Sequence, residues 1–193
     1  MTTVKRKMFL ATCICGLLGS SLFAQSLPAQ SSSDWKAVFQ SRLALYGHRN
    51  WIVVSDSAFP AFSKPGVETV VANEGLSSVL KYVESAISTS RHVRATAFVD
   101  KELQFIDEND FPGVSELRRQ IRVAFTKTPD SSMLHAKLMS QVDEAGETYR
   151  VLFIKTTETI PYTTVFLRLD CGYLDDAGER KIRSAMASAE AKH

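Results

Sequence analysis

The sequence predicts one layered α/β domain in which helices flank a central, mainly parallel sheet. Segments with continuous apolar centres, such as WIVVSD (51–56), alternate along the chain with segments of helical apolar spacing, such as 76–87. A continuous apolar centre is typical of a strand that is covered on both faces of its sheet. The length of 193 residues and the hydrophobic content of 45% suit a single domain that buries its own core.

Residues 1–24 are expected to be a secretory signal peptide and not part of the fold. A basic cluster at 5–7 is followed by the apolar stretch MFLATCICGLLGSSLFA. Cleavage is expected after Ala24, with Ala29 as the second choice and an uncleaved N-terminal anchor as the alternative. We therefore expect an exported protein, periplasmic or secreted, with no stable membrane span after cleavage.

Removal of residues 1–24 changes the charge balance and the cysteine content. Three of the 23 Lys and Arg residues leave and all 21 Asp and Glu residues stay, so the formal net charge goes from +2 to 20 − 21 = −1. A slightly acidic chain gives no reason to expect a nucleic-acid partner. Of the three cysteines only Cys171 remains, so no disulfide scaffold is expected.

The remaining elements follow behind a polar linker at 25–33. Helices are predicted where apolar residues share one helical face, at residues 34–46, 76–87, 112–125 and 135–146. Gly146 is expected to end the last of these helices. Strands are predicted where β-branched and apolar residues run together or alternate, at residues 51–56, 67–72, 92–100, 148–156 and 162–170. The domain is expected to span 34–174, with a polar helical tail at 175–193.

The stretch GHRNWIVVSDSAFP (47–60) holds the first candidate functional residues. His48 precedes the first predicted strand and Asp56 follows it. Histidine is the natural proton shuttle near neutral pH, and a carboxylate can accept hydrogen bonds from sugar hydroxyls. An extended chain separates the two residues by about 25 Å, too far for one small ligand. The structural alternatives are a histidine that binds helix-end carbonyls and an aspartate that caps a turn.

The same stretch is similar to the strand-bearing motif of the ribose pyranase and fucose mutarotase family (RbsD/FucU). That motif has a Gly-His pair, an aliphatic run, and then an aspartate, a small residue and a proline. ETVVANEGLSSVLKYVESAI (68–87) resembles the family segment after the motif, and KTTETIPYTTVFLRLDCG (155–172) resembles its closing segment. The three matches occur in order and span most of residues 40–172.

The resemblance implies roles for individual residues. His48 matches the family's general acid/base, and Asp56 matches its substrate-binding carboxylate. Further substrate contacts are implied for His135, Tyr162, Thr163 and Thr164. The family needs no cofactor. Its members form rings in which a neighbouring subunit completes each site, so a homo-oligomer is expected and the distance between His48 and Asp56 is no obstacle.

The implied function is that of a monosaccharide mutarotase or pyranase, an isomerase that opens a cyclic sugar by general acid–base catalysis. One proton leaves the anomeric hydroxyl and another reaches the ring oxygen. Asn50 stands where the family usually has an acidic residue, and Thr164 stands where it has asparagine. The sequence therefore does not identify which sugar is the substrate.

Other functions also stay open. A non-catalytic secreted monosaccharide-binding protein and a structural oligomer with a vestigial site are both compatible with the fold. The four histidines show no ligand spacing, so no metal is expected. Ser57 lacks a nucleophile elbow, which argues against a serine hydrolase.

Overall fold

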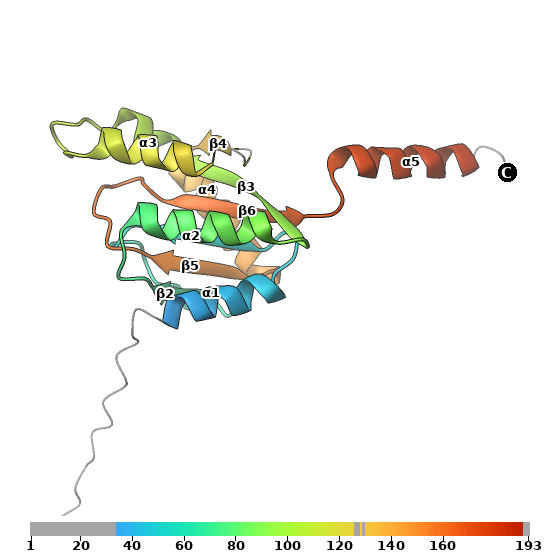
Figure 1. Ribbon diagram of the computed structural model, residues 1–193, viewed down its shortest axis with the longest axis horizontal. Coiled ribbons are helices and arrows are strands. Elements are labelled where there is room, and N and C mark those ends of the chain that lie inside the picture. The colour runs from blue at the N-terminus through green and yellow to red at the C-terminus, as the bar shows by residue number, and fades with distance from the viewer. Residues whose placement is uncertain (1–33, 126–127, 129, 191–193) are drawn as a thin grey trace, which may run out of the picture.

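The computed structural model describes residues 34–125, 128 and 130–190. The predicted signal peptide (1–24) and linker (25–33) lie outside the described residues. The described chain forms a six-stranded sheet with helices on both faces (Figure 1). The predicted α/β class with a central, mainly parallel sheet is confirmed.

The helices and strands lie close to their predicted positions. The helices are α1 (Asp34–Leu45), α2 (Leu76–Thr89), η1 (Lys101–Phe105), α3 (Val114–Ala124), α4 (His135–Thr148) and α5 (Asp176–Glu190). The strands are β1 (Trp51–Ser55), β2 (Val67–Val71), β3 (Val93–Asp100), β4 (Asp130–Met133), β5 (Val151–Lys155) and β6 (Val165–Cys171). The sequence did not predict β4, because DSSM carries no apolar alternation and forms a strand by pairing with β3.

The strand order β2-β5-β1-β6-β3-β4 brings the ends of many strands together. Strand β5 is parallel to β1 and β2, and β4 is parallel to β3. Strand β6 is antiparallel to both of its neighbours, β1 and β3. Five strands therefore end at one edge of the sheet, which we call the carboxyl edge, and β6 begins there.

Alternate residues of β1 show how the two faces of the sheet are covered. Ile52 and Val54 belong to the core under α1, α2 and α3, whereas Trp51 and Val53 pack on the side of α4. Figure 1 shows α1 and α2 in front of the sheet and α4 behind it. Burial of each large apolar side chain contributes about 1.5–3 kcal/mol, so coverage of both faces makes β1 a central and well-anchored strand.

Helix α4 continues past Gly146 to Thr148, so the prediction that Gly146 ends this helix is wrong. The helix packs closely against the segment that leads into β2. A Cβ atom at Gly146 would lie 2.9 Å from Cγ2 of Val67, and one at Gly66 would collide with the Gly146 carbonyl oxygen. Gly146 therefore permits a close approach between helix and chain.

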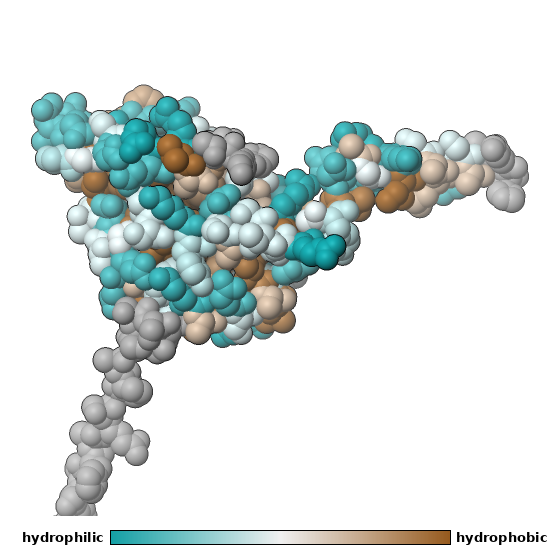
Figure 2. Space-filling model, in the orientation of Figure 1, coloured by the Kyte–Doolittle hydropathy of each residue, from teal (hydrophilic) through white to brown (hydrophobic). Residues whose placement is uncertain are grey.

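Helix α5 projects from the body of the molecule as an arm (Figure 1), and none of its residues is buried. Nη2 of Arg94 lies 3.3 Å from Oδ1 of Asp176, which links the first turn of α5 to β3. Ile182 and Met186 of the arm are exposed. Figure 2 shows hydrophobic surface along the arm. Neither α5 nor any other described helix is long and apolar enough to cross a membrane.

Candidate active site at the carboxyl edge

The strand register gathers several polar residues at the carboxyl edge. Val165, the first residue of β6, pairs with Val54 on one side and Val99 on the other. Thr164, one residue earlier, therefore lies between the ends of β1 and β3. Asp56 directly follows β1, and Asp100 is the last residue of β3. The antiparallel entry of β6 thus brings residues more than 40 positions apart into one place.

His135 adds an imidazole to this edge. It is the first residue of α4, directly behind β4. Its Nδ1 lies 3.0 Å from Oδ2 of Asp100, whose side chain has no exposed surface. The carboxylate of Glu102 accepts hydrogen bonds from the backbone N–H of His135, at 3.0 and 3.1 Å. The His135 side chain is 31% exposed, so Asp100 fixes the ring on one side and solvent can reach it on another.

Three aromatic rings surround the imidazole of His135. The ring of Tyr162 stands edge-on to it at a centroid distance of 5.7 Å. Phe59 and Phe166 lie at 6.1 and 6.3 Å, also in edge-on arrangements. These contacts restrict the plane of the imidazole and give the site an apolar wall beside its polar groups.

Asp56 faces the same site from the end of β1. Its Oδ1 accepts a hydrogen bond from the backbone N–H of Ala58 at 2.9 Å, so the carboxylate shapes the turn that follows the strand. Its Oδ2 lies 3.5 Å from Oγ1 of Thr164. Thr163 is fully buried and donates its hydroxyl to the carbonyl of Ile160. Thr163 thus supports the segment, while Asp56 and Thr164 face each other.

The backbone of Tyr162 has a φ of 58°, in the left-handed region that a residue with a side chain rarely adopts. Such a conformation costs about 1–3 kcal/mol and persists only where the surrounding structure enforces it. Tyr162 lies at the end of the turn that precedes β6. Its ring lies beside His135, and Tyr162 is 40% exposed. The strained residue is therefore one of the residues that line the site.

The contact between Asp100 and His135 changes the ionisation of both groups. The hydrogen bond to Asp100 raises the pKa of His135, and partial burial opposes this rise. Burial raises the pKa of Asp100, and the hydrogen bond from His135 acts in the opposite direction. His135 thus keeps its proton to a higher pH than a free imidazole, which suits a group that exchanges protons near neutral pH.

His48 lies at the opposite edge of the sheet from Asp56 within one chain. Strand β1, about 16 Å long, separates them. The exposed His48 borders a hollow of about 560 Å³ between the end of β6 and the α5 arm. Ile182 and Met186 of the arm line the same hollow. Asp56, His135, Tyr162 and Thr164 come together in one chain, and His48 does not join them.

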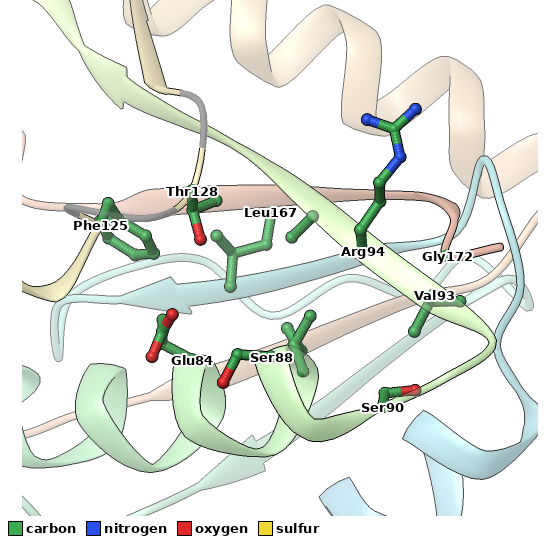
Figure 3. A pocket seen from close by; sticks show the side chains of 11 residues that line it. Glu84, Ser88, Ser90, Val93, Arg94, Phe125, Thr128, Leu167 and Gly172 are labelled. Atoms are coloured by element: carbon green, nitrogen blue, oxygen red, sulfur yellow. The ribbon is translucent and has the colours of Figure 1, made fainter. Parts of the chain in front are cut away.

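A second hollow, a groove of about 500 Å³, lies over β3 and β6 beside α2 (Figure 3). It is lined by Val93, Ala95 and Leu167, and Glu84 is the one carboxylate among the described lining residues. None of the described residues that line it is a histidine, so acid–base chemistry is better served at the carboxyl edge. Within the described part of the chain, no three His, Cys, Asp or Glu side chains gather as a metal site requires.

The sequence reasoning missed Asp100 and Glu102. Little in the sequence pointed to Asp100: the alternation of β3 places it on the same side as Arg94, Thr96 and Phe98, where a polar residue looks ordinary, and only the structure shows that it is fully buried. A charged residue at an inward strand position indicates a paired or functional group. Its partner could not be identified, because β4, which places His135, was not predicted.

Residues 37–171 match the model of the RbsD / FucU transport protein family. Among solved structures, RbsD of Bacillus subtilis complexed with D-ribose has 15% sequence identity, covers 69% of this chain and 92% of its own, and has a TM-score of 0.52. The fucose mutarotase of Streptococcus pneumoniae in complex with L-fucose has 14% identity, coverage of 68% and 89%, and a TM-score of 0.47. A comparison with curated proteins finds no match.

Proposed function

Since the chain belongs to the RbsD / FucU transport protein family, we propose that it is a mutarotase or pyranase that interconverts the cyclic forms of a free monosaccharide. The observation that carries this proposal is the imidazole of His135 beside Asp56, Tyr162 and Thr164 at the carboxyl edge. Ligands of open α/β sheets generally bind outside the carboxyl ends of the strands. The similar Bacillus subtilis structure contains D-ribose, which makes pentoses the first substrates to test.

Ring opening requires a group that takes a proton and a group that delivers one. His135 can exchange a proton with one sugar oxygen, and the Asp56 carboxylate can accept hydrogen bonds from hydroxyls. The Tyr162 ring offers an apolar surface for a sugar face and a hydroxyl for orientation. General acid–base catalysis contributes about 10²–10⁴-fold, enough for a reaction that already proceeds slowly in water.

His48 is proposed to act from a neighbouring copy of the chain. It lies at the far edge of the sheet from Asp56, so a homo-oligomer in which one copy's far edge meets another copy's carboxyl edge would supply a second imidazole. The exposed apolar stripe of α5 beside His48 supports association at this edge. Each site would then hold one imidazole for each of the two proton transfers.

The experiment is magnetisation-exchange NMR on D-ribose, L-fucose and a panel of other pentoses and hexoses. Wild-type protein should accelerate exchange between the cyclic forms of at least one sugar. His135→Gln and His48→Ala should each abolish most of the acceleration and leave the fold intact. His92→Gln is the matched control, because His92 lies at the same edge of the sheet as His48 but its ring binds Ser90 and the Leu43 carbonyl. No acceleration with any sugar would reject the catalytic proposal.

Mixing the two inactive variants tests whether His48 and His135 come from different copies. If a site takes His135 from one subunit and His48 from the next, refolded mixtures of His48→Ala and His135→Gln contain some complete sites. Exchange activity should then reappear in the mixture at a fraction of the wild-type rate. A mixed oligomer that stays inactive would reject the shared site and indicate that His48→Ala abolishes activity in another way, such as through assembly.

A non-catalytic monosaccharide-binding protein is the second candidate. Thr164 favours it, because its side chain is buried and its hydroxyl is directed to Asp56 at 3.5 Å, so it offers a sugar less than an asparagine would. Such a protein would show a sugar-dependent rise in melting temperature without any exchange acceleration. Absence of both effects would favour a structural oligomer with a vestigial site.

Export to the periplasm or exterior is proposed from the N-terminal residues. Mass spectrometry of the secreted chain should find a new N-terminus at Gln25, or at Gln30 if the second cleavage choice is used. A chain that keeps Met1 and stays with the membrane fraction would favour the uncleaved anchor.

A further inference from the structure

Asp100 and His135 meet because two strands end side by side. The β3–β4 register pairs Asp100 with Met133, and His135, two residues further on, begins α4. Asp100 lies on the same side of β3 as Phe98, toward α4. Its carboxylate is fully buried, and the imidazole nitrogen of His135 is its hydrogen-bond partner.

We propose that Asp100 is a positioning residue that holds His135 in one tautomer, with the Nδ1 proton toward Asp100 and Nε2 left free for proton exchange with substrate. A carboxylate accepts hydrogen bonds and cannot donate one when ionised, so the neutral imidazole must direct an N–H toward it. The substrate part of this inference rests on the proposed function, whereas the tautomer is a property of the sugar-free protein.

A purely stabilising role explains the Asp100 carboxylate poorly. Its Oδ1 has no hydrogen-bond partner among the described residues, although the side chain is fully buried. A buried charge with incomplete hydrogen bonding costs stability, and a well-packed apolar residue is often as stable or more so. The carboxylate is better explained by its effect on the imidazole that it contacts.

The surroundings single out Asp100 as the group that acts on the ring nitrogen. The other titratable groups that face the pair are Glu102, Asp56 and Tyr162. Arg118 and Arg122 of α3 line a cavity on the opposite face of β3. Glu102 binds the backbone N–H of His135 and not its ring. Arg118 donates to two backbone carbonyls in and after η1. The tautomer therefore depends on one side chain, which makes it testable by one substitution.

The test is ¹⁵N NMR of the full chain with labelled histidine, without sugar, across a pH series. His135→Gln identifies the His135 signals. In the wild type, neutral His135 should carry its proton on Nδ1, and its pKa should lie above the free value of about 6.5. Asp100→Asn should move the proton to Nε2, because the amide can donate to Nδ1, and should lower the pKa. Glu102→Gln, the matched control, should keep the wild-type tautomer.

The exchange assay provides the second readout. Asp100→Asn should slow catalysed sugar exchange about 10²-fold or more and change the sugar affinity little, since the lost contribution is proton transfer. The positioning role is overturned if neutral wild-type His135 carries its proton on Nε2, or if Asp100→Asn leaves the tautomer unchanged. The wild-type tautomer decides the matter even if Asp100→Asn fails to fold. An inactive wild type with the Nδ1 proton would reject the proposed function alone.

Discussion

Oγ1 of Thr164 lies 3.5 Å from Oδ2 of Asp56, although 108 positions separate the two residues in the chain. The contact exists because β6 enters the sheet antiparallel to β1, so that the start of one strand meets the end of the other. His48 precedes β1 in the chain and therefore lies at the opposite end of that strand. One chain therefore brings together the carboxylate of Asp56 and the segment that follows Tyr162, and His48 lies apart from both.

Asp56→Asn should weaken sugar binding roughly 10- to 100-fold, because hydrogen bonds to a charged group contribute about 1.5–3 kcal/mol. The asparagine oxygen can still accept from the N–H of Ala58, so the turn and the fold should survive. Titration with the sugar that the exchange assay identifies measures the effect. Asp143→Asn, which removes a surface charge beside Lys64, is the control. Equal affinity in both variants would remove Asp56 from the binding site.

Tyr162→Gly should separate stability from sugar recognition. Glycine adopts positive φ without strain, so the free energy of unfolding should stay within about 1 kcal/mol of the wild type or rise. The loss of the ring should at the same time reduce the sugar-dependent thermal shift by more than half. Denaturant unfolding and thermal shift on the same samples measure the two effects. A large loss of stability would indicate that the ring serves packing.

The stability difference between wild type and His135→Gln should depend on pH. The folded-state pKa of His135 is raised by Asp100, so its contribution is fully present below about pH 6.5, the unfolded value. It should decline as the pH rises through the raised folded value, because the unfolded state releases its proton first. A difference of about 1–3 kcal/mol is expected at pH 5.5. Urea unfolding at pH 5.5, 7 and 9 measures this trend, which a rising difference would contradict.

Gly146→Ala should destabilise the protein by about 1–3 kcal/mol through overpacking against Val67. Gly47→Ala is the matched control, because a Cβ atom there meets nothing within 4 Å and should change stability by less than about 0.5 kcal/mol. Chemical denaturation gives both values. A neutral Gly146→Ala would show that α4 can move away from the segment before β2 at little cost.

The double variant Ile182→Glu/Met186→Glu should shift the proposed oligomer toward smaller species. Each of these exposed apolar side chains would contribute about 1.5–3 kcal/mol if buried in an interface, so the dissociation constant should rise roughly 10²-fold or more. Ser184→Glu, on the polar side of α5, controls for added charge. Light scattering after size-exclusion chromatography measures the mass. An unchanged mass would exclude the arm from assembly.

The sequence was sufficient to predict the fold class and most elements, because these depend on local patterns. The stripe from Leu76 to Ile87 has a helical periodicity, and the apolar centre of WIVVSD is short and β-branched, as is typical of a buried strand. The resemblance in GHRNWIVVSDSAFP indicated Asp56 as a candidate, and the structure brings that residue beside Thr164.

The tertiary structure determined which residues that are distant in the chain become neighbours. Strand β4 has no pattern of its own and forms because β3 offers it a pairing edge, and this pairing alone brings His135 to Asp100. Gly146 looks like a helix end in the sequence, yet contact with Gly66 and Val67 makes it a packing residue. Partners distant in the chain are chosen by strand register and close packing, and neither can be read from the order of the residues alone.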